Sequence, residues 1–144
     1  MPKLKFSVNA KSENPTKTVV KARGFSIIID EPSDLGGTNA GANPVEYVLA
    51  ALSGCLNVVG HIVAKEMGFT LRALEIDLEG QLDPTKFMGK PTQERAGYTE
   101  ISVTLKPDAD ASKDVLDQWV KTIESRCPVS DNLANATPVK LMLG

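Results

Sequence analysis

A long apolar segment, residues 43–68, constrains the fold of this chain more than any other stretch. It opens with three helix-start signals, which are Asn43 for the N-cap, Pro44 for the first helical position and Glu46 three residues after the cap. Gly68 is a natural left-handed stop for a helix. Between these ends, apolar residues recur at helical spacing: Val48, Leu49, Leu52, Leu56, Val59, Ile62 and Val63. The segment therefore predicts an interior helix of roughly 36 Å that is apolar around most of its circumference.

Small and polar residues limit what can surround this helix. Small residues recur along it, at Ala50, Ala51, Gly54 and Gly60. They let a sheet or a second copy of the helix approach closely. Polar side chains such as His61 and Lys65 interrupt the apolar run, so the sequence does not predict a membrane span.

The composition bounds the class of protein. A chain of 144 residues is one domain's worth, so we expect a single domain over residues 1–144. The net charge of −2 and the pI near 5.4 provide no basic surface for nucleic acid, and the few aromatic residues provide no stacking platform for bases. The N-terminus turns polar before a signal-peptide core forms. We therefore expect a soluble, cytoplasmic protein that binds neither nucleic acid nor membrane.

Alternating or continuous apolar runs predict about six β-strands. They fall at residues 4–10, 17–22, 25–29, 71–82, 98–105 and 138–143. The simplest arrangement of the first three is an antiparallel meander. Two long connections rich in glycine, proline and charge, residues 30–42 and 83–97, interrupt the series, and loops of this length are often functional.

A second helix is predicted after the fifth strand. Asp110 or Ser112 caps it, and an apolar stripe runs along it. The stripe consists of Val115, Leu116, Trp119, Val120 and Ile123. The helix stops near Cys127, because the residue before Pro128 disfavours the helical region; residues 130–135 suit a further helical turn. The fold class is therefore α+β, an antiparallel sheet with a long central helix and a second helix packed on it.

The two cysteines are the candidate chemical groups. Two cysteines and one histidine cannot supply four zinc ligands, and neither cysteine belongs to a C-x-x-C pair. Cys55 alone fits a core residue that fills space. Cys127 lies where a new turn begins at Pro128, and a thiol there can meet unpaired backbone N–H groups, which favour the thiolate. The positions fit an attacking and a resolving thiol, and they equally fit two unrelated core residues.

A family resemblance rests on two motifs. They are Asn43-Pro44-x-Glu46-x-x-x-Ala50-Ala51-x-x-x-Cys55 and Cys127-Pro128-Val129-Ser130, with Asp30-Glu31-Pro32 and Gly36-Gly37 leading in. In this order they resemble the OsmC/Ohr family of thiol-dependent peroxidases, in its OsmC-like branch. The resemblance implies an intertwined homodimer with the central helices buried at its centre and two active sites at the subunit interface.

The resemblance also implies a reaction. Cys55 is the peroxidatic thiolate, which attacks the O–O bond of a hydroperoxide and becomes a sulfenic acid, and Cys127 condenses with it to a disulfide. A dithiol reductant of the lipoyl or thioredoxin type reopens the disulfide, and no metal or organic cofactor is needed. The apolar surroundings favour organic hydroperoxides over hydrogen peroxide. The alternative is a non-catalytic dimer of the same fold that binds a small apolar ligand at the subunit interface.

A thiolate at Cys55 requires stabilisation. At an ordinary pKa of about 8.5, only roughly 3% of a thiol is ionised at pH 7. A cysteine in the middle of a helix cannot draw this stabilisation from a helix terminus, so we expect a cation beside it. Arg23 is the first candidate, because the resemblance places the activating arginine in the N-terminal strands; otherwise Arg23 is a solvated charge at a strand end. Arg126 adjoins Cys127 and equally suits a helix C-terminus.

Glu46 and His61 have structural alternatives. The resemblance makes Glu46 the carboxylate that orients the arginine, whereas with Asn43 it completes a capping box. Glu46 lies nine residues before Cys55, about 13.5 Å of helix rise and half a turn out of phase, so it would act at the site of a partner subunit. His61 lies about 240° around the helix from Cys55 and is expected to be a hydrogen-bonded residue without a catalytic role.

Overall fold

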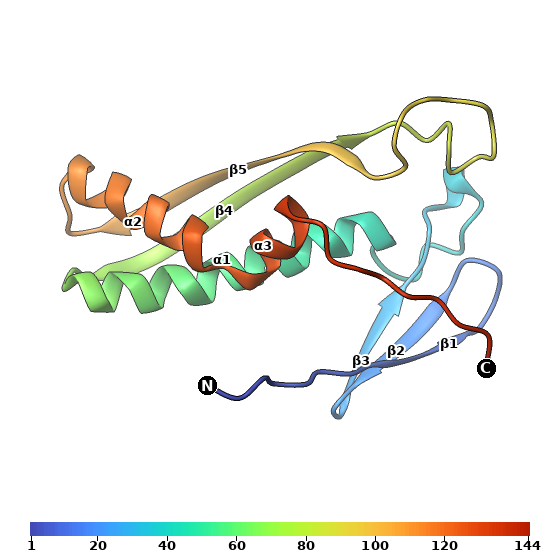
Figure 1. Cartoon of the computed structure of the whole chain (residues 1–144), viewed down its shortest axis with the longest axis horizontal. Helices are drawn as coiled ribbons and strands as arrows, with labels where there is room; N and C mark the ends of the chain where they lie inside the picture. Colours follow the sequence, from blue (N-terminus) through green and yellow to red (C-terminus); the bar gives the residue numbers. More distant parts are fainter. The chain divides into compact units, whose positions relative to one another are not determined.

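The computed structural model describes all 144 residues, which form two compact units, Met1–Val48 and Leu49–Gly144. The first unit holds an antiparallel meander in the order β1-β2-β3 (Figure 1). Its strands are β1 (Asn9–Ser12), β2 (Thr18–Ala22) and β3 (Phe25–Ile29). The helix α1 (Pro44–Met67) starts in this unit and continues into the second. The predicted meander and the predicted helix are confirmed, including the left-handed Gly68, whose φ is +77°.

A buried carboxylate organises the connection between β3 and α1. Asp30 is fully buried and accepts hydrogen bonds from the hydroxyls of Thr16 and Thr38 and from the backbone N–H groups of Glu31 and Ala40. Burial raises the pKa of Asp30, but the hydrogen bonds, first from Thr38 and Thr16, outweigh burial and hold the pKa well below its ordinary value. The connection also contains a short 3-10 helix, Ser33–Leu35. A charged Asp30 therefore joins the turn between β1 and β2 to the connection between β3 and α1.

We expect Asp30→Asn to lower the urea midpoint of unfolding clearly more than Asp34→Asn, which alters an exposed carboxylate in the same connection. The amide carries one oxygen in place of two, and it has no negative charge to stabilise the hydrogen bonds from the surrounding donors. Because the pKa of Asp30 is lowered on folding, its contribution is present above the unfolded pKa of about 3.9 and is lost as the pH falls through the folded pKa. The difference between the native protein and Asp30→Asn should therefore narrow below about pH 4. Equal midpoints for the two variants at pH 7 would contradict this role.

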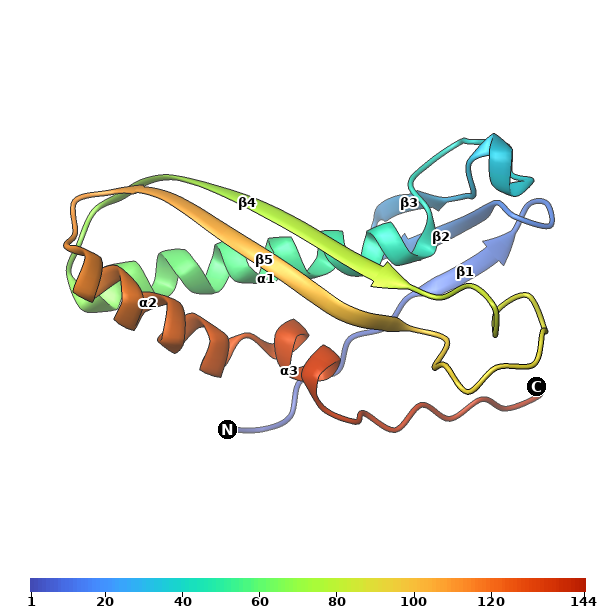
Figure 2. The ribbon, with the colours of Figure 1, turned by 90° about the horizontal axis from the view of Figure 1, so that it is seen from above.

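The second unit is built on a long two-stranded ribbon. β4 (Leu71–Leu82) pairs antiparallel with β5 (Tyr98–Ala109), and the helices α2 (Lys113–Arg126) and α3 (Pro128–Ala134) follow. Alternate residues of the ribbon pack against the helical core, and α1 and α2 lie along that face (Figures 1 and 2). These residues are Leu74, Ile76 and Leu78 of β4 with Ile101 and Leu105 of β5.

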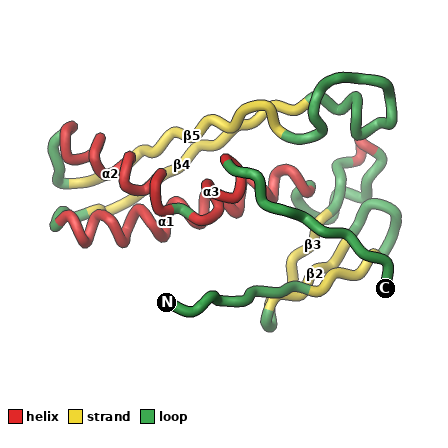
Figure 3. Tube along the Cα trace, viewed as in Figure 1, coloured by secondary structure: helices red, strands yellow, loops and turns green.

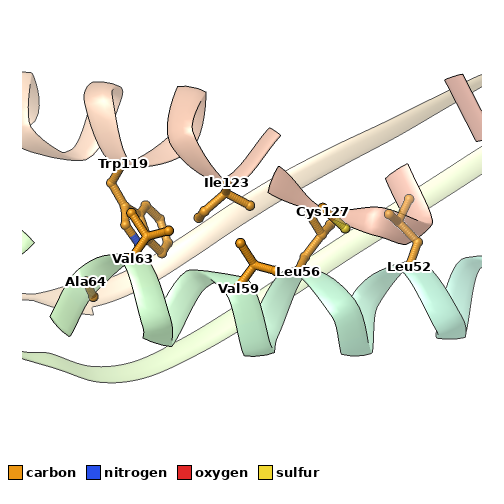
Figure 4. Packing of buried hydrophobic residues seen from close by; sticks show 8 residues of the cluster. All are labelled: Leu52, Leu56, Val59, Val63, Ala64, Trp119, Ile123 and Cys127. Atoms are coloured by element: carbon orange, nitrogen blue, oxygen red, sulfur yellow. The ribbon is translucent and has the colours of Figure 1, made fainter. Parts of the chain in front are cut away.

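The core lies between α1 and α2. It consists of Leu52, Leu56, Val59, Val63, Ala64, Trp119, Ile123 and Cys127 (Figure 4). Trp119 is fully buried, and its Nε1–H donates to the carbonyl of Gly60 at 2.8 Å. A Cβ at Gly60 would lie 3.2 Å from the Trp119 ring, so the glycine lets the indole approach α1 closely. The predicted core role of Trp119 is confirmed.

One predicted strand is displaced in the single chain, and another is absent. β1 begins only at Asn9, and residues 138–143 form no strand, so the chain has five strands in two sheets instead of about six (Figure 3). Both terminal segments carry alternating exposed apolar residues: Leu4, Phe6 and Val8 at one end, and Val139, Leu141 and Leu143 at the other. The pattern suits a strand, but a strand also needs a neighbouring edge to bond to, and neither segment has one here.

The prediction of an interior helix is met on only one face of α1 in the single chain. Only one face of α1 is buried, while Val58 and Ile62 on another are 57% and 45% exposed. With 24 residues and a mean hydropathy of 1.7 over 18 of them, α1 is long and apolar enough to cross a membrane. The core helix of a soluble protein meets the same two criteria. The exposed apolar face is thus without a partner in the single chain.

Candidate thiol site

The fold brings the two cysteines together within the second unit. Cys55 lies in the middle of α1, and Cys127 lies at the junction of α2 and α3, where it ends one helix and caps the next. Both are free thiols, and they are close enough to hydrogen bond with each other. Figure 4 shows Cys127 in the row of core side chains, near Leu52 and Leu56. Two residues remote in sequence therefore form one dithiol site.

Cys127 is the buried member of the pair. Only 1% of it is exposed, and its N–H donates to the carbonyl of Ile123 at 3.0 Å. Its Sγ accepts the N–H of Ser130 at 3.4 Å, in the position of an N-cap side chain, and Pro128 opens α3. The predicted contact between this thiol and the N–H groups of a helix start is confirmed.

Cys55 is half-buried and is the more exposed member of the pair. Burial is the main influence on Cys55 and raises the pKa of its thiol, contact with Cys127 raises the pKa further, and a hydrogen bond from the Val129 N–H lowers it. The pKa of Cys55 is raised on balance. The single chain therefore keeps Cys55 mainly as a thiol at neutral pH.

The Val129 N–H is a functional group that the sequence analysis missed. We expected no helix terminus beside a mid-helix cysteine, and that expectation is wrong, because the first turn of α3 lies against Cys55. A signal was present in the sequence: Pro128 opens a helix, and the N–H groups that follow it have no intrahelical acceptor. What the sequence could not supply was the packing of α3 on α1.

The three arginines of the second unit bind groups other than the thiols. Arg72 pairs with Asp108 and Asp110, both at 2.6 Å. Arg126 pairs with Glu66. The side chain of Arg95 donates to the carbonyl of Tyr98 at 3.3 Å. Arg126 is the basic residue in the last turn of α2, which fits the helix C-terminal role of its two alternatives.

Arg23 lies in the first unit, in the tight turn between β2 and β3. Its φ is +59°, and the Gly24 N–H donates to the carbonyl of Ala22 across the turn at 2.9 Å. Its guanidinium lies 5.0 Å from the centre of the Phe25 ring, a cation–π contact at the surface. The role of Arg23 beside Cys55 stays a prediction.

Glu46 and His61 both make local contacts. The Asn43 N–H donates to Glu46 Oε2 at 2.8 Å, and the Glu46 N–H donates to Asn43 Oδ1 at 2.9 Å, so the capping box is formed. The role of Glu46 in orienting an arginine stays a prediction. His61 is exposed, with Nδ1 3.0 Å from the carbonyl of Asn57, as expected of a hydrogen-bonded residue. No three histidine, cysteine or acidic side chains gather in an arrangement that could hold a metal ion.

Comparison with known proteins identifies the family. The model of the OsmC-like protein family matches residues 37–142. The chain belongs to the OsmC-like family. The matched range of this OsmC-like protein includes Glu46 and both cysteines, whereas Arg23 precedes it. No curated protein matches the sequence.

Solved structures share the OsmC-like fold at low sequence identity. An OsmC-like protein from Mycoplasma pneumoniae is 20% identical, with 91% of this chain and 88% of that chain covered and a TM-score of 0.80. An organic hydroperoxide resistance protein OsmC from Legionella pneumophila is 19% identical, with 91% of each chain covered and a TM-score of 0.65. The organic hydroperoxide resistance protein OhrB of Bacillus subtilis is 19% identical, with 89% of each covered and a TM-score of 0.58. These matches confirm the α+β OsmC-like fold.

Proposed function

We propose that this OsmC-like protein is a thiol-dependent peroxidase that reduces organic hydroperoxides through Cys55 and Cys127. The observation that carries the proposal is the contact between a half-buried thiol in α1 and a buried thiol at the junction of α2 and α3. We assign the attack on the hydroperoxide to Cys55, the more exposed thiol, and closure of the disulfide to the buried Cys127. The family includes cysteine-based hydroperoxide reductases, and two solved relatives are described as organic hydroperoxide resistance proteins.

The proposed reaction runs in three balanced steps. The Cys55 thiolate attacks the outer oxygen of ROOH, the O–O bond breaks, and the alkoxide takes a proton and leaves as ROH. The Cys127 thiolate then attacks the sulfur of the Cys55 sulfenic acid, and hydroxide leaves as water on taking a proton, so that a disulfide forms. A dithiol reductant of the lipoyl or thioredoxin type returns two electrons and two protons. The Val129 N–H lowers the pKa of Cys55 and so favours its thiolate, and the Ser130 N–H donates to the Cys127 sulfur.

The proposal includes a homodimer that completes the site. The exposed face of α1, with Val58 and Ile62 beside the small Ala51 and Gly54, supports pairing of this helix with a second copy. The unpaired apolar segments at both termini support an intertwined arrangement. The raised pKa of Cys55 calls for a cation, and in the dimer Arg23, oriented by Glu46, supplies it and lowers that pKa. We place this dimer of single-domain chains, residues 1–144, in the cytoplasm.

Oxidation of the reduced protein tests the proposal directly. One equivalent of cumene hydroperoxide should remove two hydrogens from the mass and join the peptides that carry Cys55 and Cys127. A tryptic map with and without a dithiol identifies the link, because the dithiol restores both peptides. An unchanged mass, or oxidation that spares both cysteines, would contradict the peroxidase.

The raised pKa of Cys55 is the observation that favours the alternative, a dimer that binds a small apolar ligand without catalysis. The two functions predict different pKa values for Cys55, which the pH dependence of alkylation measures. In the dimer, a peroxidase should show a Cys55 pKa below its ordinary value of about 8.5 in the pH dependence of iodoacetamide labelling, measured in Cys127→Ser. A ligand-binding dimer should keep the pKa of Cys55 raised.

A further inference from the structure

An ion pair links α2 to α1 directly beside the second cysteine. Arg126 is the last residue of α2, and both terminal nitrogens of its guanidinium bind the carboxylate of Glu66 near the end of α1; the Nη2–Oε1 distance is 3.2 Å. The two partners support each other, since the pKa of Glu66 is lowered and that of Arg126 is raised. The next residue along the chain is Cys127.

The ion pair between Arg126 and Glu66 restrains movement of α2 along the axis of α1. α2 runs antiparallel to α1 (Figures 1 and 2), and the bond from Trp119 to the Gly60 carbonyl fixes one point of their register. Glu66 lies eleven residues after Cys55, about three turns, and hence on the same side of α1. A second fixed point at the end of α2 resists sliding of α2 along α1, which would carry Cys127 away from Cys55.

A disulfide is demanding in geometry, because the two Cα atoms must lie within about 4.4–6.8 Å and the sulfurs must meet at a fixed dihedral angle. We propose that Arg126 and Glu66 are a positioning pair that sets Cys127 against Cys55 and thereby favours the Cys55–Cys127 disulfide. The inference rests on the proposed function, in which this disulfide is the oxidised state. Without the pair, the reduced protein gains freedom that the covalently closed form lacks, so closing the disulfide becomes more costly.

The same pair contributes little to overall stability. Arg126 and Glu66 are 42% and 52% exposed, and exposed pairs contribute about 1 kcal/mol or less. A local positioning role and a general stabilising role therefore predict different results. The chain offers a matched control in Arg72 with Asp108, which are 47% and 60% exposed and lie on the ribbon.

The experiment measures the disulfide equilibrium of the full-length protein in buffers of reduced and oxidised glutathione. Samples are quenched with acid and counted by mass, and thermal unfolding confirms that each variant is folded. We expect Arg126→Gln and Glu66→Gln each to lower the equilibrium constant for the disulfide about fivefold, the equivalent of 1 kcal/mol, and the double variant to lower it no further. Arg126→Lys keeps the charge but loses the two-point contact. Its equilibrium constant for the disulfide should lie between those of the two Gln variants and that of the native protein. The equilibrium constant of Arg72→Gln should stay within about twofold of that of the native protein.

Each outcome decides a question. Equal effects of Arg126→Gln and Arg72→Gln, or additive effects in the double variant, would overturn the positioning role. Failure of glutathione to form the disulfide in the native protein would overturn it as well. If glutathione forms the disulfide but cumene hydroperoxide does not, the peroxidase proposal fails while the positioning role is still measured.

Discussion

Cys55→Ser is expected to lower kcat/KM for cumene hydroperoxide by about 10³-fold or more, to the level of the uncatalysed reaction. Serine has nearly the shape of cysteine, but its hydroxyl does not ionise near neutral pH and cannot form a sulfenic acid. The measurement is consumption of hydroperoxide in the presence of a dithiol. Turnover that survives the change would mean that the enzyme assignment is wrong.

Cys127→Ser is the matched variant and separates the two roles. Its Cys55 thiol should still react once with hydroperoxide, because the attacking sulfur is unchanged. The product should be a sulfenic acid that dimedone traps, instead of a disulfide. A Cys127→Ser protein that reacts no faster than Cys55→Ser would contradict the assignment of Cys55 as attacking thiol.

Local sequence signals were sufficient for the helices. The capping box at Asn43 and Glu46, Pro44 at the first position and Gly68 at the end are all formed as the sequence indicates, because each depends on residues within one turn of helix. The N-cap role of Cys127 belongs to the same class, since Pro128 starts the next helix. Periodicity of 3.6 also identified Trp119 as a core residue.

The pairing of the terminal segments and the contacts at the thiol site depend on residues that are remote in sequence, so local patterns do not predict them. Apolar alternation in residues 4–8 and 139–143 describes a strand with one buried face, but a strand also requires pairing with a neighbouring strand, and neither segment is paired in the single chain. The hydrogen bond from Val129 to Cys55 depends on how α3 packs on α1, which no motif encodes. The same is true of the pair formed by Arg126 and Glu66, which are sixty residues apart.

Trp119→Ala is expected to lower the free energy of unfolding by about 4 kcal/mol, which makes it the most damaging core substitution considered. The side chain is fully buried, it meets the Phe69 ring edge-on with centroids 6.2 Å apart, and its Nε1–H bonds to the carbonyl of Gly60. Alanine would leave a cavity that α1 cannot fill, because the position facing the indole is a glycine.

Two further variants divide the contribution of Trp119. Trp119→Phe keeps an aromatic ring and loses the hydrogen bond, and we expect it to cost about 2 kcal/mol. Val120→Ala, at a neighbouring position of α2 that is 41% exposed, should cost less than about 1 kcal/mol. Urea unfolding of the reduced protein measures all three, and a Trp119→Ala cost no larger than that of Val120→Ala would contradict the packing described. Because Trp119 also fixes the register of α2 on α1, Trp119→Ala should lower the glutathione equilibrium constant of the Cys55–Cys127 disulfide even under conditions in which the variant remains folded.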